Sequence, residues 1–405
     1  MASENLLLMR ETLASKQARI NKRYKFYDMK NTTPDFGIST PPKLRNLNYC
    51  LGWCTKAVDA LADRVVFKQF ENDTAGFNEI ASMNNPDIYF DSAVLEGLIG
   101  ACSFTYIKKD GDGIPVWEVI TANKATGIID KTTGLLKEGY ILLETGDYGF
   151  PKLEAHLLPF RTDIVDAEND EIVESYSHSS PYPLLVPHLN RPDSRRPFGH
   201  SQISRSCMDL VQSAVRTVKR SEISAEFYSF PQKYLLGTSD ETEIEKWEAA
   251  MSAMIDIPKD SDGDKPTVGQ FQVASQQPHI EQLRMFAAMF AGETGLTLDD
   301  LGFPSDNPSS AEAIKSQHEN LRIRARKAQK TFGTSFINVG YLSACLRDNQ
   351  PYERKAFYRI KPTWYPIFEP DSSMLSLMGD GAIKLNQAVE GYMDEATLNR
   401  ITGIK

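Results

Sequence analysis

The stretch SQISRSCMDLVQSAVRTVKRSEISAEFYSF, residues 201–230, contains neither proline nor glycine. Apolar residues recur along it near the spacing of one helical face, at Ile203, Cys207, Leu210, Val211, Ala214, Val218 and Ala225. At 1.5 Å per residue the predicted helix would be about 45 Å long, more than twice the usual three or four turns. Pro231 follows and ends it. A helix of this length needs packing partners along much of its surface, because helical stability comes largely from packing.

The chain before this helix predicts an α+β region. Helical spacing of Leu6, Met9, Leu13 and Ile20 predicts an amphipathic helix over 4–29. Two more helices are predicted within 45–67 and 87–109, each running into a strand. Turn signals such as DGDG and KTTG then separate five predicted strands of an antiparallel sheet, at 104–109, 115–121, 126–131, 138–144 and 152–158. A basic, proline-rich loop, PLLVPHLNRPDSRRPFGH, leads from this region into the long helix.

A smaller mixed unit follows the long helix. We predict strands at 232–237 and 268–274, a helix at 240–255 between them, and a further helix at 278–295. An acidic loop, LTLDDLGFPSDNP, comes next. A strand at 353–366 and a helical region at 372–403 close the chain.

The stretch SSAEAIKSQHENLRIRARKAQK, residues 309–330, predicts a second long helix that continues to about Cys345. Its second half carries Arg322, Arg324, Arg326, Lys327 and Lys330, although the whole chain has a formal net charge of −9. A solvated helix face is the usual explanation for such a run. The alternative is a surface that meets a polyanion or the acidic residues of another subunit.

The composition describes an acidic, globular chain. Its 405 residues, 41% hydrophobic and 24% charged, suffice for more than one domain with a buried core. No apolar run approaches the roughly 20 residues that cross a bilayer, and the first residues lack the pattern of a signal peptide. We therefore expect no membrane contact and a protein that stays in the cytosol where it is made. Five scattered cysteines predict reduced thiols, and the net charge argues against a protein that coats nucleic acid.

The sequence contains no phosphate-binding loop, dinucleotide fingerprint or H-E-x-x-H motif. Cys50 and Cys54 are spaced i, i+4, but no second pair of metal ligands follows, which favours packing over metal binding. Asp299, Asp300 and Asp306 could hold the metal of a nuclease, although a capped acidic loop is the commoner reason for such residues. We predict a non-enzymatic protein without catalytic residue, metal or cofactor. A metal-dependent nucleic-acid-processing enzyme and a monomeric adaptor module remain alternatives.

Four stretches in one order resemble a known family: WCTKAVDALADRVVFKQF, PLLVPHLNRPDSRRPFGHSQIS, EFYSFPQKYLLG and LGFPSDNPSSAEAIKSQHENLRIRARKAQKTFG. Together they span about residues 40–402, and they resemble the portal proteins of tailed bacteriophages, in particular those of long-tailed phages of Gram-positive hosts. The resemblance implies a ring, usually of twelve subunits, at one capsid vertex. Such rings are passages through which a terminase motor drives DNA in and the tail receives it.

The resemblance also implies a division of the chain. Residues 1–200 would form an α/β wing, 201–230 the first stem helix, 231–279 a small α/β clip, 280–296 the second stem helix, 297–309 the channel loop, 310–348 a long bent helix, 349–372 a returning wing strand and 373–405 a helical crown that is short for the family. Neighbours in a ring would cover the apolar stripe of the long helices. An acidic chain suits a channel, because many contacts between cations and phosphate would hold DNA in place.

Site residues follow from this mapping. The channel-loop candidates are Asp299, Asp300, Phe303, Asp306 and Asn307, and the candidates on the basic helix for contact with DNA or another subunit are Arg322, Arg326 and Lys330. The docking candidates in the clip are Glu241, Glu243, Glu245 and Trp247. Expected partners are further copies of the chain, double-stranded DNA without sequence readout, the terminase large subunit, tail adaptor proteins, and capsid and scaffolding proteins. Assembly is expected in the host cytoplasm and the final location in the virion.

Overall fold

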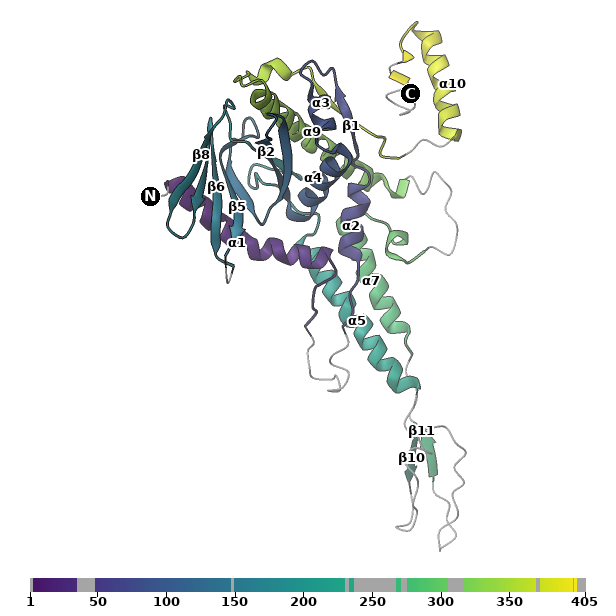
Figure 1. Ribbon diagram of the computed structural model, residues 1–405. Helices are drawn as coiled ribbons and strands as arrows, with labels where there is room; N and C mark the ends of the chain where they lie inside the picture. The colour runs from purple at the N-terminus through teal and green to yellow at the C-terminus, as the bar shows by residue number, and fades with distance from the viewer. Residues whose placement is uncertain are drawn as a thin grey trace, which may run out of the picture.

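The computed structural model describes residues 3–34, 48–146, 149–229, 233–236, 267–270, 275–304, 316–368, 372–395, 397 and 398. Within these residues, helices and antiparallel strands form a body, and a pair of helices extends from it to a short β-ribbon (Figure 1). The architecture is α+β, as the sequence predicts. No helix in this described part is both long enough and apolar enough to cross a bilayer.

The strands of the body form two antiparallel sheets rather than one. The three-stranded sheet has the order β3-β2-β9, with β2 (Cys102–Lys109), β3 (Pro115–Thr121) and β9 (Leu185–Leu189). The five-stranded sheet runs consecutively through β4 (Ala125–Ile129), β5 (Leu136–Thr145), β6 (Pro151–Leu158), β7 (Arg161–Asp166) and β8 (Glu171–Ser177). The five predicted strands correspond to β2–β6, and β7, β8 and β9 are additional.

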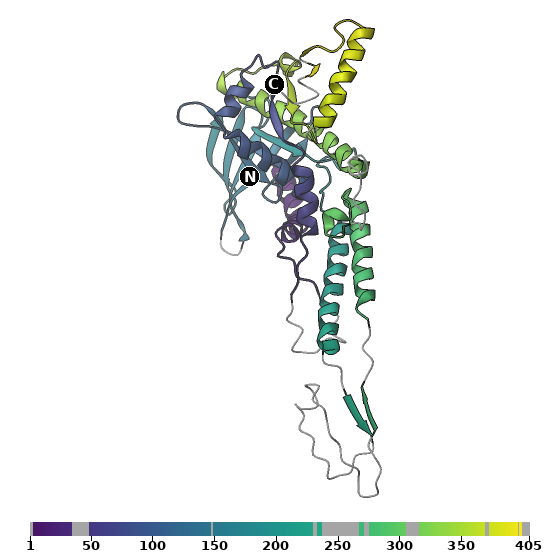
Figure 2. The same ribbon diagram turned by 90° about the vertical axis from the view of Figure 1, so that its right-hand side faces the viewer.

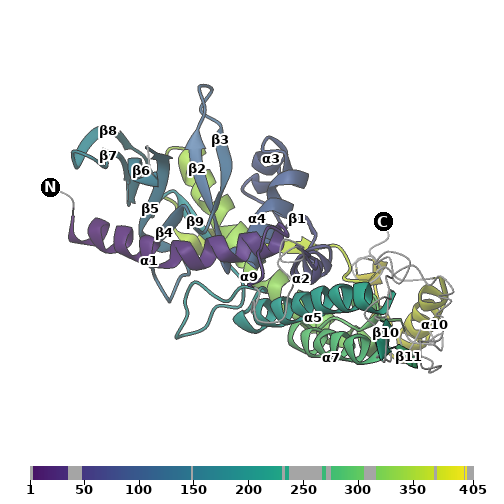
Figure 3. The same ribbon diagram turned by 90° about the horizontal axis from the view of Figure 1, so that it is seen from below.

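Helix α1 (Glu4–Tyr27) lies beneath the body (Figure 3). Ser3 caps its first turn, because the Ser3 hydroxyl accepts a 3.2 Å hydrogen bond from the amide of Leu6. Its apolar stripe forms a small separate core with the five-stranded sheet, composed of Leu6, Met9, Leu13, Tyr140, Leu142 and Val165. Arg10 pairs at 2.7 Å with Glu154, whose side chain is fully buried in that sheet.

The main core lies between the three-stranded sheet and the helices packed on it. These are α2 (Trp53–Ala62), α3 (Phe77–Ser82), α4 (Pro86–Gly100) and α9 (Glu319–Arg347), together with a ribbon of β1 (Phe67–Glu71) and β12 (Lys361–Trp364). Helix α3 is not among the predicted helices. The second half of α9 is buried, with Phe332 and Phe336 fully inaccessible to solvent. Fully buried His188 on β9 joins Thr105 of β2 to Ser335 of α9 through hydrogen bonds of 2.5 and 2.7 Å.

Helices α5 (Arg205–Ser229) and α7 (Gln277–Thr294) lie side by side and lead away from the body to the ribbon of β10 (Lys233–Leu236) and β11 (Thr267–Gln270) (Figure 2). We call this pair the stem. Helix α5 begins at Arg205 rather than at 201, because the Ser204 hydroxyl accepts a hydrogen bond from the amide of Cys207 at 3.1 Å. The helix predicted at 240–255 lies outside the described residues.

The last part of the chain differs from expectation at one element. Residues 353–366 contain a 3-10 turn, η4 (Arg354–Phe357), before strand β12, so the first half of the predicted strand is wrong. Phe357 and Ile360 are buried three residues apart, which is the repeat of a 3-10 turn and not of a strand. Helix α10 (Ser372–Ala388) follows at the end of the molecule opposite to the β10–β11 ribbon (Figure 1).

Candidate channel and interaction surfaces

The two stem helices are joined by apolar contacts and by polar pairs along their length. Thr217 donates a 3.0 Å hydrogen bond to the Gln282 side chain, and Ser204 donates one of 3.0 Å to Glu293. Val211 and Ala214 of α5 are fully buried, as are Ala287 and Phe290 of α7. The stem is therefore a closely packed antiparallel hairpin within one chain.

The opposite face of α7 is apolar but uncovered. Met285 and Met289 are 50% and 55% exposed, and exposed Ala288 and Gly292 share their face at i, i+3, i+4 and i+7 spacing. Since α5 packs on the other side of α7, nothing in the described part of the chain covers these methionines. Periodicity in the sequence does not single out these methionines, because it does not tell which of two apolar faces a neighbouring helix buries.

Arg324 of α9 binds the end of α7. Helix α7 ends at Gly295, whose φ of 82° lies in the left-handed region. The Arg324 guanidinium donates a 2.8 Å hydrogen bond to the carbonyl oxygen of Glu293 in the last turn. Burial, and then the nearby Arg191, lower the pKa of Arg324. A cation at this end also suits the helix dipole, so Arg324 fixes the stem against the body.

We expect Arg324→Met to lower the free energy of unfolding by about 1 kcal/mol, because it removes a charged hydrogen bond at a partly exposed helix end but keeps the apolar stem. Arg326→Met, two residues away on an exposed part of the same helix, is the matched control and should change stability by less than about 0.5 kcal/mol. Urea unfolding and hydrogen exchange of the last amides of α7 would measure both. Equal decreases in the two variants would contradict the assigned contact.

The acidic loop after α7 begins with a 3-10 turn, η3 (Asp299–Leu301). The Asp300 carboxylate accepts hydrogen bonds from the amide and the hydroxyl of Thr297, both at 2.9 Å, and so caps the turn. Phe303 is half-buried against the main core, whereas Asp299 is exposed. Asp306 and Asn307 lie outside the described residues. The structure thus gives Asp300 a capping role and leaves Asp299 at the surface.

The three cations predicted on the second long helix lie in different surroundings. Within the described residues α9 begins at Glu319, and Arg322 forms an ion pair with Glu319 one turn before it. Arg326 and Lys330 are exposed one turn apart. The docking candidates Glu241, Glu243, Glu245 and Trp247 lie outside the described residues. Among the described residues, no cluster of three or more His, Cys, Asp or Glu side chains is arranged to hold a metal ion.

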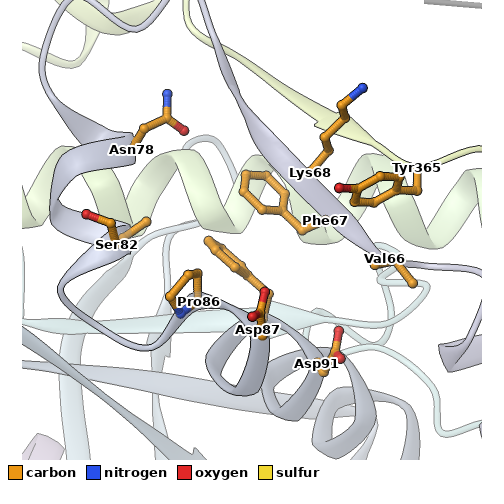
Figure 4. Close-up of a pocket in the computed structure, with 11 residues that line it drawn as sticks. Val66, Phe67, Lys68, Asn78, Ser82, Pro86, Asp87, Asp91 and Tyr365 are labelled. Atoms are coloured by element: carbon orange, nitrogen blue, oxygen red, sulfur yellow. The ribbon is translucent and has the colours of Figure 1, made fainter. Parts of the chain in front are cut away.

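A pocket of about 380 Å³ opens between β1, α3 and the start of α4 (Figure 4). Phe67 and Phe90 form its floor, with ring centroids 4.0 Å apart. Asp87 and Asp91 of α4 stand at its edge, and burial followed by Asp87 and Asp63 raises the pKa of Asp91. Carboxylates beside aromatic rings disfavour phosphate and suit a basic side chain. Lys68 also lines the pocket, so its rim carries charges of both signs.

Comparison with known proteins gives a match over nearly the whole chain. No protein-family model matches. The chain is 22% identical over 397 residues to the portal protein of Mycobacterium phage L5, an alignment that covers 92% of this chain and 79% of the phage protein. It is 21% identical over 382 residues to the portal protein of Mycobacterium phage D29, which covers 89% of this chain and 77% of that protein.

Two solved structures from gene transfer agent particles also align with the fold. A chain in the virion of the native particle aligns with a TM-score of 0.47 and 12% identity, covering 87% of this chain and 90% of that one. A chain in the neck of the native particle, computed with C12 symmetry, aligns with a TM-score of 0.45 at the same identity and coverage.

The two phage alignments cover 92% and 89% of the chain, and both relatives belong to the family that the sequence resembles. On these alignments the chain is a distant homologue of the portal proteins of mycobacteriophages L5 and D29.

Proposed function

We propose that the chain forms a homo-oligomeric ring at one vertex of the capsid and that double-stranded DNA passes through this ring during packaging and ejection. The observation that carries the proposal is the alignment of nearly the whole chain with two portal proteins. The resemblance in sequence suggests twelve subunits. The stem would surround the passage, and the exposed aspartate of η3, Asp299, would face a polyanion that must slide and not adhere.

The uncovered face of α7 supports a ring. Two exposed methionines on a helix that leaves the body would be shielded from water if a neighbouring stem packed on them. Complete burial of an exposed methionine side chain is worth about 1.5–3 kcal/mol, so covering these half-exposed side chains would add roughly half of that per methionine at every interface of the ring. A contact between unlike faces that closes by rotation produces such a ring.

The partners follow from the same arrangement. We propose that the terminase large subunit, and later the tail adaptor proteins, dock on the chain at the end of the stem where β10 and β11 lie, with Glu241, Glu243, Glu245 and Trp247 as contact candidates. Capsid and scaffolding proteins would contact the body. The bounds proposed for wing, stem, clip, channel loop and crown remain those of the sequence analysis.

Particle mass tests the proposal directly. We expect native mass spectrometry and negative-stain images of the purified chain to show rings of about a dozen 45.4 kDa subunits around a central hole. Met285→Glu with Met289→Glu should convert these rings to monomers with unchanged circular dichroism, because charges would replace the apolar contact. Met83→Glu, a methionine of the body that is 52% exposed, is the matched control and should leave the rings intact.

Two results would contradict the proposal. A compact dimer that cleaves DNA in the presence of a divalent metal would favour a nucleic-acid-processing enzyme. A wild-type chain that stays monomeric at high concentration, with and without scaffolding protein, would favour an adaptor module. Rings that survive in the Met285 and Met289 variant would keep the ring and reject α7 as its interface.

A further inference from the structure

A second apolar pocket lies at the end of the body opposite to the β10–β11 ribbon. It has a volume of about 370 Å³, and Ile337 and Tyr341 of α9 line it together with Phe357, Tyr358 and Ile360 around η4. Figures 1 and 2 both place this part of the chain, which follows the buried half of α9, at the edge of the body away from the stem. Tyr358 is 72% exposed at the rim of the pocket.

Cations surround this pocket and continue along α9. Arg354 and Lys355 line the pocket with Thr334, and Thr334 lies one helical turn beyond Lys330. Arg326 precedes Lys330 by a further turn, so the row extends along one face of the helix. The guanidinium of Arg359 lies 5.5 Å from the ring centroid of Tyr358. We call Arg326, Lys330, Arg354, Lys355, Tyr358 and Arg359 the upper basic surface.

Few carboxylates neutralise this surface. Lys355 pairs with Glu353 on the exposed segment before η4. Within the described part of the chain, Lys330 and Arg354 have no ion pair with a carboxylate. In a chain with a net charge of −9, a group of cations in which Lys355 alone pairs with a carboxylate of the described residues leaves a local positive potential.

We propose that the upper basic surface binds the phosphate backbone of duplex DNA outside the channel. This proposal rests on the proposed function in one respect, namely that the polyanion available to the protein is DNA. Arg326 and Lys330 lie one turn, about 5.4 Å along the helix axis, apart on α9, and Arg354 and Lys355 follow at the pocket. This extended arrangement suits a repeating polyanion better than a single phosphate. Arginine and an exposed tyrosine at the rim add planar groups that pack against sugar and phosphate.

The contact would carry no sequence information, since the partner groups on this surface are cations and a tyrosine hydroxyl, which suit the phosphate backbone. The part of the surface formed by Arg354, Tyr358 and Arg359 lies at the edge of the body away from the stem, whereas Arg326 lies near the end of α7. DNA held there would approach the body from the side of α10, so the same ring would have one surface that lets DNA slide and another that retains it weakly.

A closed circular duplex separates the two kinds of contact, because a circle has no end that could enter a preformed ring. We expect the wild-type protein to bind a small relaxed circle at low salt. Lys330→Gln combined with Arg354→Gln and Arg359→Gln should weaken that binding by about tenfold, and the slope of log affinity against log salt should become shallower by about 0.9 for each phosphate that the variant no longer neutralises. Fluorescence anisotropy of a labelled circle over a salt series would measure both.

The matched control neutralises three cations elsewhere. Lys131→Gln, Lys137→Gln and Lys152→Gln remove the same charge from exposed positions around the five-stranded sheet and should leave affinity and salt slope unchanged. Equal weakening in both triple variants would overturn the proposal, because net charge alone would explain it. Disappearance of the ring mass in the first variant, with binding of the circle retained, would overturn it in favour of a contact between subunits. If the wild-type chain is monomeric but the first triple variant still binds the circle more weakly than the second, the ring is rejected and the DNA-binding surface is kept.

Discussion

Alanine at position 199 is expected to lower the free energy of unfolding by about 3 kcal/mol, through a backbone clash added to left-handed strain. Gly199 has a φ of +80°, and a Cβ atom there would lie 2.2 Å from the carbonyl oxygen of Asn190 and 3.0 Å from that of Ala101. Neither oxygen can move freely, because the Asn190 carbonyl accepts a 2.8 Å hydrogen bond from the amide of His200, and the Ala101 carbonyl accepts one of 3.0 Å from Asn190. Urea unfolding would measure the decrease.

Gly134→Ala separates the clash from the backbone strain. Gly134 has a similar φ of +74°, but a Cβ atom there would meet nothing within 4 Å. This variant should therefore cost only the left-handed penalty, about 1 kcal/mol. A Gly199→Ala variant that is no less stable than Gly134→Ala would show that the loop can rearrange and would contradict the close contact.

The position of Gly199 explains why the clash matters for function. Gly199 lies six residues before α5 begins at Arg205, and the same loop bonds to the end of α4, because the amide of Gln202 donates a 2.9 Å hydrogen bond to the carbonyl of Leu98. The start of the stem is thus fixed to the body by backbone hydrogen bonds. The sequence predicts only a proline-rich loop here, because the contact joins residues that no local pattern relates.

Helices of the chain could be predicted well from periodicity. The predictions at 4–29, 201–230 and 278–295 agree with α1, α5 and α7 to within a few residues. Each of these helices packs one apolar face on a neighbour and exposes the other, so burial imposes a 3.6-residue repeat on the sequence. Differences at helix starts come from caps. For example, the Ser204 hydroxyl accepts a hydrogen bond from the amide of Cys207, and α5 therefore begins later than predicted.

Strands were harder to predict where burial does not alternate. Every residue of β8 is exposed, so Ile172 and Val173 follow each other without a face to the core. In 353–366, Ala356, Tyr358 and Ile360 alternate with other residues as in a strand, although the buried pair is Phe357 and Ile360. Tertiary packing on α9 selects the 3-10 turn, and a two-residue alternation of apolar side chains cannot reveal that choice.

For the candidate surfaces, the sequence identified the charges but not their partners. The ion pair of Arg322 with Glu319 is visible as an i, i+3 spacing. Arg324 and Arg326 cannot be distinguished in the pattern RIRARK, yet one binds the end of α7 and the other faces solvent. Their difference arises from where α7 ends, which is a fact of the tertiary structure. Likewise, nothing local places Arg354 and Thr334 around one pocket.

The buried network around His188 joins three elements of the body through consistent donors. The Ser335 hydroxyl donates a 2.7 Å hydrogen bond to the carbonyl of Phe332, so it accepts a hydrogen bond from the N–H of His188 Nδ1. The unprotonated Nε2 then accepts from the hydroxyl of Thr105, which lies 2.7 Å from that of Tyr89. The pattern fits a neutral imidazole, and complete burial lowers the pKa of His188 to about 3.

This buried neutral histidine should make the fold sensitive to acid. The unfolded chain binds a proton at His188 below its ordinary pKa of about 6.5, whereas the folded chain does not bind it until about pH 3. Stability therefore decreases as the pH falls below 6.5, and His188 alone should account for about 2.5 kcal/mol between pH 7 and pH 4.5.

His188→Gln keeps a donor and an acceptor but cannot take up that proton, so its unfolding free energy should fall by about 2.5 kcal/mol less than that of the wild type over this range. Ser335→Ala is the matched variant: it removes an acceptor and lowers stability at pH 7, but it retains the histidine and should keep most of the wild-type decrease. Urea unfolding at pH 7, 6 and 4.5 would measure all three proteins, and parallel pH profiles for the wild type and His188→Gln would show that other groups cause the acid sensitivity.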